Sequence, residues 1–293
     1  MYPAAFEYLR PGGVDEAVEL LRRHGDDAKL LAGGQSLVPM MKLRVARPRY
    51  LIDIHRIAGL NYIREEAGSI RIGATTRHAQ IEASPLLREK ISILADAAGE
   101  IGDAQVRNRG TIGGGLAEAD PVGDYGPVAL ALNARMKCIG PRGAREIPAT
   151  ELFTFAYTTA LEPDEILTEI IFPLPAKNSA GVYVKLEKVA GDFAIAAAAV
   201  QGSLGKDGAC DTIGVGVSGG GPVPLKAIDV ESFLRGKRIT PELIDQAGRM
   251  VQEHAEPIED LRGSAAHKKK ALGTVLRRAI AETLRRAGAE RTS

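Results

Sequence analysis

The sequence predicts an α+β protein in two domains, and three observations lead to this prediction. Stretches with the apolar spacing of helices alternate with short β-like runs along the 293 residues. Two glycine turns, over residues 32–36 and 111–115, each follow or interrupt a buried-looking segment. A segment rich in proline and polar residues, 173–179, separates a first domain over 1–177 from a second domain over 178–293.

Composition and charge argue against several classes of protein. Lys and Arg total 38 against 37 Asp and Glu, so the net charge of +1 does not favour a nucleic-acid or anionic-membrane surface. The apolar run 194–200 is too short to span a bilayer, and the first residues do not resemble a secretion signal, so we expect a cytoplasmic protein. Cys138 and Cys210 lie outside any metal-binding motif, so we expect two reduced, buried thiols and no metal site.

The first 55 residues are predicted to form a small βαβ unit. Residues 14–24 place apolar side chains at helical spacing, with Asp15 and Glu16 in the first turn, and Gly25 follows as a stop signal. The apolar run 29–32 is typical of a buried strand. The remaining expected elements are a short helix capped by Ser36 and ending at Met41, and a second strand over 49–54.

The rest of the first domain, 56–177, alternates predicted strands and helices. Residues 69–74 alternate between apolar and polar side chains, as a half-buried strand does. The further elements expected are helices over 77–83 and 86–98, a helix that follows 120–125 and ends at Leu132, and strands over 136–139 and 169–172. The second glycine turn therefore lies between two helices.

The second domain is expected to be a compact α+β unit. The expected strands cover 181–189 and 210–217, the segment 193–204 is either a strand or a helix, and helices lie near 227–235, 241–253 and 267–287. The glycine run 214–221 is followed by Pro222 and Pro224, so a hairpin turn is expected there.

The two glycine turns carry the clearest chemical signal. Without a Cβ, a main chain can approach a phosphate closely enough to donate N–H hydrogen bonds, and a helix N-terminus adds partial positive charge. Neither turn matches the GxGxxG or GxxxxGK[ST] nucleotide motifs. One such turn is more often a tight strand–helix corner. Two in one chain favour a clamp on both sides of a diphosphate-containing cofactor.

The order of these motifs resembles a known family. Ala32-Gly33-Gly34-Gln35-Ser36, followed by Gln105-Val106-Arg107-Asn108 and Thr111-Ile112-Gly113-Gly114, is similar to the FAD-binding medium subunits of molybdenum hydroxylases. The resemblance runs along essentially the whole chain, including residues 73–76, 120–124 and 185–194. It implies a vanillyl-alcohol-oxidase (PCMH)-type FAD-binding domain in two subdomains, about 1–55 and 56–177, followed by the C-terminal α+β domain.

The same resemblance implies a function and partners. FAD in this chain receives electrons from a small subunit with two [2Fe-2S] clusters, while a large molybdopterin subunit hydroxylates the substrate. The electrons then pass to an external acceptor, and the complex is expected to be a dimer of heterotrimers. Two alternatives stay open: a single-chain flavin oxidase, and a non-enzymatic nucleotide-binding scaffold subunit. The substrate and the acceptor are not implied, and no catalytic residue is assigned to this chain.

The resemblance also implies the cofactor-binding residues. The main chain of Ala32, Gly33, Gly34, Gln35 and Ser36 and of Thr111, Ile112, Gly113, Gly114 and Gly115 would hold the diphosphate, with added hydrogen bonds from the side chains of Gln35, Ser36 and Thr111. Lys29 would offset phosphate charge, and its alternative is a solvated strand residue. Asp124 would make a polar cofactor contact or cap the next helix.

Four positions are expected near the flavin ring. Ile101 and Leu167 match apolar positions beside the ring, although most such residues are plain core. Lys185 and Phe193 match positions at which the C-terminal domain approaches the flavin. Two departures from the family pattern are Phe193, where related subunits have Tyr, and Gly115, where Asn or Ser is common.

Overall fold

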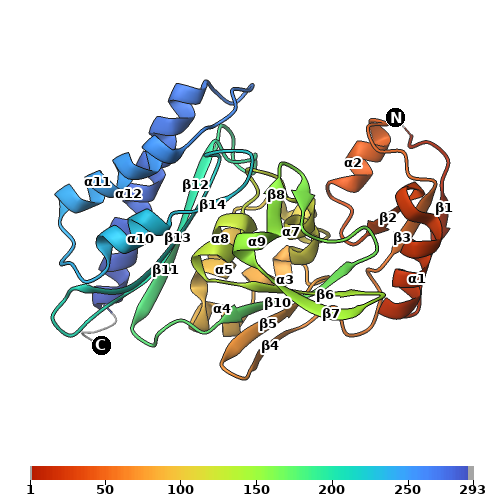
Figure 1. The fold of residues 1–293 in the computed structure, drawn as a ribbon, viewed down its shortest axis with the longest axis horizontal. Helices are drawn as coiled ribbons and strands as arrows, with labels where there is room; N and C mark the ends of the chain where they lie inside the picture. The colour runs from red at the N-terminus through yellow and green to blue at the C-terminus, as the bar shows by residue number, and fades with distance from the viewer. Residues whose placement is uncertain (1, 290–293) are drawn as a thin grey trace.

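The chain forms three parts that follow one another across the molecule. The computed structural model describes residues 2–289. Figure 1 shows the N-terminal unit at one end, a central sheet with its helices in the middle, and the C-terminal sheet with α10–α12 at the other end. The mixture of helices and separate sheets confirms the predicted α+β class.

The N-terminal unit contains the predicted βαβ arrangement together with a further strand, β1, that was not expected. Its three strands lie in the order β1-β3-β2 and pair in parallel. Helix α1 buries Ala17, Val18 and Leu21, and Gly25 ends it with a positive φ of 51°. The elements are β1 (Glu7–Leu9), α1 (Val14–His24), the 3-10 turn η1 (Gly25–Asp27), β2 (Ala28–Leu31), α2 (Leu37–Lys42) and β3 (Tyr50–Asp53).

The central part is an antiparallel five-stranded sheet in the order β4-β5-β10-β6-β7. Its strands are β4 (Ile63–Glu66), β5 (Ser69–Gly73), β6 (Arg135–Gly140), β7 (Gly143–Pro148) and β10 (Ile166–Pro173), and a small hairpin adds β8 (Phe153–Phe155) and β9 (Thr158–Thr159). Its helices are α3 (His78–Glu82), α4 (Pro85–Lys90), α5 (Ser92–Gly99), α6 (Ala104–Arg107), α7 (Ile112–Glu118), α8 (Tyr125–Ala131) and α9 (Ala149–Leu152).

Two expectations for this part are corrected. The single helix predicted over 86–98 is two helices, α4 and α5, because Ile91 leaves the helical conformation with φ −147° and ψ 66°. Ile91 is buried in the same cluster as Leu87 and Leu94, so it stays in the core although it interrupts the helix. Strand β4 has no counterpart among the expected elements, since three of its four residues are exposed and carry charge, so no apolar alternation marks it.

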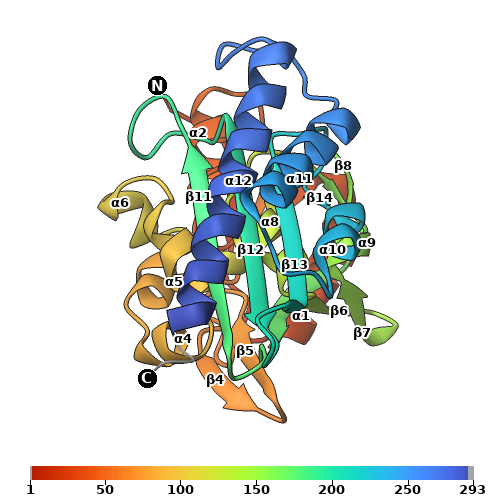
Figure 2. The ribbon, with the colours of Figure 1, turned by 90° about the vertical axis from the view of Figure 1, so that its left-hand side faces the viewer.

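The C-terminal part is a four-stranded antiparallel sheet covered on both faces. The strands are β11 (Ser179–Leu186), β12 (Ala196–Leu204), β13 (Cys210–Ser218) and β14 (Leu225–Lys226), in that order. Segment 193–204 is therefore mostly strand and not helix. Figure 2 shows α11 and α12 crossing one face. The helices are α10 (Ile228–Leu234), α11 (Pro241–His254) and α12 (Ala265–Ala289).

The other face of this sheet lies directly on helix α8 of the central part. Ala197 and Ala199 on β12 are fully buried. A Cβ at Gly214 or Gly216 of β13 would collide with main-chain carbonyl oxygens of α8. The sheet and the helix are therefore close-packed, and the C-terminal part is fixed against the central part.

Two further findings concern the cysteines and the helices. Cys138 and Cys210 are both free and buried, as predicted. Among the helices within residues 2–289, none combines the length and apolar character that crossing a membrane requires.

Candidate cofactor-binding site

A cleft of about 510 Å³ lies between the N-terminal unit and the central part. Its walls include the turn after β2, the start of α7, and the beginning of β10. Eleven of the sequence-predicted residues line it: Lys29, Ala32, Gly33, Gly34, Gln35, Ser36, Thr111, Gly113, Gly114, Gly115 and Leu167. The fold thus brings both glycine turns, which are far apart in sequence, to one cavity.

The first glycine turn presents unbonded main-chain donors to this cleft. Gly34 has a positive φ of 76°, which reverses the chain between β2 and α2. Within residues 2–289, the N–H groups of 33–36 have no hydrogen-bond acceptor. Ser36 occupies the N-cap position of α2, but its hydroxyl makes no capping bond, which corrects the predicted cap. Four N–H groups and one hydroxyl are therefore available to a ligand.

The second glycine turn differs, because its N–H groups already have partners. It is the first turn of α7, and the donors are bonded as follows: Ile112 N to Thr76 O (3.0 Å), Gly113 N to Ala74 O (2.9 Å), Gly114 N to Thr111 Oγ1 (3.2 Å) and Gly115 N to Thr111 O (3.0 Å). The expectation that both turns offer free amides is therefore corrected for 112–115. Ile112 itself is fully buried in the core and does not line the cleft.

Close packing explains two of the glycines without any ligand. A Cβ at Gly33 would lie 2.6 Å from Gly110 Cα, so the two turns touch each other through their main chains. A Cβ at Gly113 would lie 2.5 Å from Ala74 Cβ. At Gly115, however, an added Cβ would have Tyr125 as its nearest neighbour at 3.6 Å, an ordinary contact distance. Packing within the protein therefore does not require a glycine at position 115, and the absence of a side chain there leaves space in the cleft.

Charge in the cleft is compatible with a bound diphosphate. Lys29 is exposed and lines the cleft, and no carboxylate among the described residues pairs with it. Glu165 is neutralised by Arg145, whose Nε and Nη2 each lie 2.7 Å from a carboxylate oxygen. Burial, and then the charge of Asp120, raise the pKa of Glu118.

His78 lies against the second turn, and the sequence does not predict it as a cleft residue. It lines the cleft while only 5% exposed, and its Nδ1 is 3.2 Å from Tyr125 Oη. Its main-chain N–H donates to Gly110 O at 3.0 Å. Burial, and then the charge of Arg107, lower the pKa of His78 to about 4. The ring is thus neutral and supports the loop that leads into α7.

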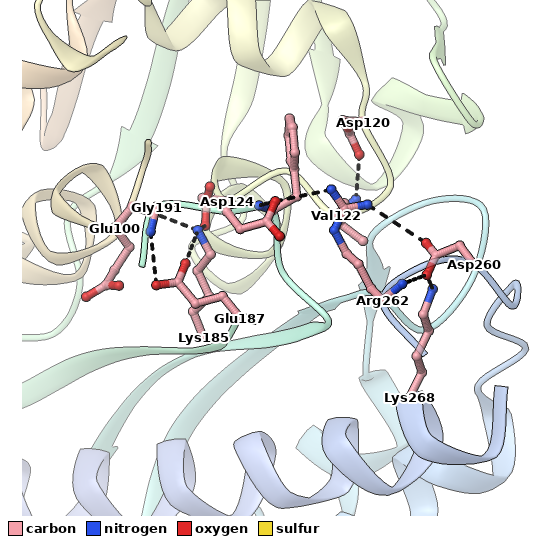
Figure 3. Close-up of polar contacts among 12 residues, drawn as sticks. Glu100, Asp120, Val122, Asp124, Lys185, Glu187, Gly191, Asp260, Arg262 and Lys268 are labelled. Atoms are coloured by element: carbon pink, nitrogen blue, oxygen red, sulfur yellow. Dashed lines mark hydrogen bonds and ion pairs between the residues drawn. The ribbon is translucent and has the colours of Figure 1, made fainter. Parts of the chain in front are cut away.

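The remaining predicted residues form a second group away from the cleft. Figure 3 shows Lys185 and Asp124 beside the connection between β11 and β12. Lys185 Nζ lies 3.2 Å from Asp124 Oδ1, 3.2 Å from Glu187 Oε2 and 2.9 Å from the carbonyl oxygen of Glu100. The Lys185 side chain is only 2% exposed, so this ion cluster is a buried joint between the central and C-terminal parts.

Asp124 is held by side chains and does not cap α8 with its own. It is the N-cap residue, but it makes no side-chain capping bond; instead its Oδ1 accepts from Tyr183 Oη at 2.6 Å. Burial raises the pKa of Asp124, and the charge of Lys185 opposes that shift. The capping alternative is therefore not supported by the side-chain geometry.

Ile101 and Phe193 complete the second group. Ile101 packs on the central core, directly before Gly102. A Cβ at Gly191 would lie 2.9 Å from Gly102 O, so the β11–β12 connection passes over this point. Phe193 is 46% exposed, and the guanidinium of Arg262 lies 5.5 Å from its ring centroid. Within residues 2–289, no three His, Cys, Asp or Glu side chains are arranged to hold a metal ion.

Comparison with known proteins gives the class. Residues 4–175 match the family described as "FAD binding domain in molybdopterin dehydrogenase", and residues 181–283 match the "CO dehydrogenase flavoprotein C-terminal domain". The chain belongs to the FAD-binding medium subunits of molybdenum hydroxylases, and it is an oxidoreductase subunit with FAD as its cofactor.

Individual relatives match along almost their whole length. The carbon monoxide dehydrogenase medium chain of Hydrogenophaga pseudoflava is 42% identical, with 96% of this chain and 97% of the relative covered. That of Afipia carboxidovorans is 39% identical, with coverage of 98% and 99%. A solved carbon monoxide dehydrogenase structure from Hydrogenophaga pseudoflava superposes with a TM-score of 0.96 at 42% identity, over 98% of this chain and 99% of that chain.

The cleft fits FAD on its own chemistry. Residues 33–36, which line the cleft, carry four unbonded N–H groups and the hydroxyl of Ser36, and an anionic diphosphate would satisfy such donors. Gly114 and Gly115 also line the cleft and add no side chain to it. Lys29 adds positive charge. The residues present therefore match the group that the family binds.

Proposed function

We propose that this chain is the FAD-carrying electron-transfer subunit of a heterotrimeric molybdenum hydroxylase. A small [2Fe-2S] subunit would deliver electrons, and a large molybdopterin subunit would hydroxylate the substrate. Bound FAD would supply the redox chemistry by taking up these electrons and releasing them to an external acceptor. The medium-chain relatives support this assignment over a single-chain oxidase or a scaffold subunit. A dimer of heterotrimers and a cytoplasmic location stay predictions.

The unbonded amides of the first turn carry the proposal. Gly33 is buried, and a buried N–H group without an acceptor is rare in a folded protein because it costs free energy, whereas Gln35 and Ser36 are exposed. We propose that the N–H groups of 33–36 bind the diphosphate, assisted by the side chains of Gln35 and Ser36. Lys29 would offset the remaining phosphate charge.

The second turn would act mainly by shape. Its glycines let the cofactor approach α7, while Thr111 holds the helix start through its bond to Gly114 N. Leu167 would give the cleft an apolar contact. We further propose that the second group, Ile101, Asp124, Lys185 and Phe193, lies near the flavin ring, and that 1–177 and 178–293 are the two domains.

A substitution that fills the cleft tests the proposal. Gly115→Leu adds a side chain where nothing in the protein collides with a Cβ. We expect the purified complex to keep its fold and lose at least tenfold in FAD affinity, because the leucine occupies cofactor space. Gly12→Leu is the matched control, since Gly12 is also exposed with a nearest Cβ contact of 3.6 Å but does not line the cleft.

Flavin absorbance and a titration of FAD fluorescence would measure the effect. Equal FAD affinity of both variants would contradict the assignment of this cleft to the cofactor. We also expect the chain without its partners to show no substrate oxidation, because no residue in it is assigned to substrate chemistry. Oxidation of substrate by the isolated chain would favour the single-chain oxidase.

A further inference from the structure

The connection between β11 and β12, residues 187–195, is held from two sides. Its base is closed by the bond from Ile195 N to Leu186 O at 2.7 Å. On the inner side, Gly191 N donates to Glu187 Oε1 at 3.1 Å, and Glu187 pairs with buried Lys185. Gly191 has a positive φ of 82°, which brings the chain against Gly102. This inner side belongs to the group already proposed for the flavin.

The outer side is held by Arg262, which no sequence motif indicated. Arg262 lies in the segment between α11 and α12. Its Nη2 donates to Asp192 Oδ1 at 3.2 Å, and its guanidinium lies 5.5 Å from the Phe193 ring centroid, within cation–π range. Asp192 Oδ1 also accepts from Phe193 N at 2.7 Å. The Asp192 carboxylate thus links the Phe193 main chain to the arginine that faces its ring.

Arg262 is itself anchored on helix α12. Asp260 Oδ1 accepts from the main-chain N–H of Arg262 at 2.8 Å and from Lys268 Nζ at 2.8 Å. Lys268 is 4% exposed, and its Nζ also donates to the Ile258 carbonyl at 2.7 Å. Because Lys268 is buried on a long helix, its position is well defined. Its contact with Asp260, and that of Asp260 with Arg262, therefore hold Arg262 in place beside the connection.

We infer that Arg262 is a positioning residue of the cofactor site: it fixes the Phe193 ring and the 187–195 connection next to Ile101 and Gly102. The inference rests on the proposed function, in which Phe193 lies near the flavin ring. It adds to the site a segment of the C-terminal part, 258–268, that lies outside the predicted residues. The guanidinium would act through Asp192 and Phe193 and not by its own contact with the cofactor.

Trypsin gives a direct measure of this arrangement. Lys188 is exposed within the connection, so its peptide bond reports how firmly the connection is held. Arg142, in the exposed turn between β6 and β7, provides an internal reference in the same chain. In the FAD-loaded full chain, we expect Arg262→Gln to raise cleavage after Lys188, relative to Arg142, about five- to tenfold.

Three further variants separate the contacts. Arg278→Gln is the matched control, because Arg278 is exposed on α12 and makes no ion pair or hydrogen bond with the described residues. Arg262→Lys keeps the charge but loses the planar group over Phe193, so an intermediate increase is expected. Asp192→Ala should raise cleavage as Arg262→Gln does, and the double variant should add little, because each single variant already removes the hydrogen bond between Arg262 and Asp192.

A flavin readout distinguishes positioning from simple stability. We expect the visible circular dichroism of bound FAD to change in Arg262→Gln but not in Arg278→Gln, while the thermal unfolding midpoint of both stays near that of the parent. Unchanged cleavage in Arg262→Gln and Asp192→Ala overturns the inference. Faster cleavage in Arg262→Gln with an unaltered flavin spectrum also overturns it, because Arg262 would then hold the connection without affecting the flavin. A parent protein that holds no FAD would instead overturn the proposed function.

Discussion

The two glycine turns look alike in sequence and differ in structure. The turn over 32–36 leaves four main-chain N–H groups unbonded at the cleft. In the turn over 111–115, the N–H groups from Ile112 to Gly115 bond to Thr76, Ala74 and Thr111. Glycine therefore permits close packing in both turns, at Gly33 and at Gly113, but only the first turn leaves its main-chain donors unbonded.

The largest expected effect comes from breaking the packing role. Gly113→Val places a Cβ 2.5 Å from that of Ala74 and 2.7 Å from its carbonyl oxygen, with a branched side chain beyond it. We expect the free energy of unfolding to fall by more than about 3 kcal/mol, since main chain must move to relieve the overlap. Urea unfolding of the full chain would measure the loss.

Gly115→Val is the control in the same helix turn. Its Cβ meets only Tyr125 at 3.6 Å, so we expect a change within about 0.5 kcal/mol. Similar losses for Gly113→Val and Gly115→Val would show that packing does not distinguish the two glycines.

The support beneath the second turn should depend on pH. His78 has its pKa lowered to about 4 in the folded protein by burial and then by Arg107. Between that value and the ordinary histidine pKa near 6.5, the unfolded chain binds more protons, so stability falls as the pH falls. For the whole shift in the His78 pKa, the free energy of unfolding should fall by about 3 kcal/mol between pH 7 and pH 4.

His78→Gln should remove that part of the pH dependence, which urea unfolding at several pH values would show. His254→Gln serves as the control, because the His254 side chain is 63% exposed. A pH profile of His78→Gln that follows the parent between pH 7 and pH 4 would assign the acid sensitivity to other groups.

The start of α7 allows a smaller test. Thr111 Oγ1 accepts from Gly114 N at 3.2 Å, and Thr111 is 2% exposed. Thr111→Ala should lower the free energy of unfolding by about 1 kcal/mol, the usual value of an N-cap bond. Thr111→Ser keeps the hydroxyl and should lose less than half of this. Equal losses would mean that the methyl group, and not the cap, stabilises the turn.

Much of the fold is predictable because it depends on local patterns. Helix α1 follows from its apolar spacing and from Gly25, and the βαβ unit follows from two apolar runs around a glycine turn. The break at Ile91 is not predictable in this way, because Leu87, Ile91 and Leu94 have the apolar spacing of one unbroken helix. Strand β4 escapes prediction because its polar residues pair with β5 at a sheet edge.

The candidate site shows the same limit. Sequence resemblance indicates Lys29 and both glycine turns, and the fold brings them to one cleft. It does not indicate His78 or Arg262, whose roles come from tertiary contacts with Gly110 and Phe193. Nor does it distinguish bonded from unbonded amides, because the acceptors Thr76 and Ala74 lie far from the second turn in sequence.

The smallest expected effect sharpens the comparison between the turns. Ser36 and Thr111 are both N-cap hydroxyl residues, but only Thr111 makes a capping bond. Ser36→Ala should therefore change the free energy of unfolding by less than about 0.5 kcal/mol, because no protein contact is lost. FAD affinity should fall about fivefold if the hydroxyl donates to the diphosphate, since one such bond is worth about 1 kcal/mol. Paired unfolding and fluorescence titrations of Ser36→Ala and Thr111→Ala would then separate ligand donors from structural caps, and a Ser36→Ala variant that loses stability but keeps its FAD affinity would reverse the roles assigned to the two hydroxyls.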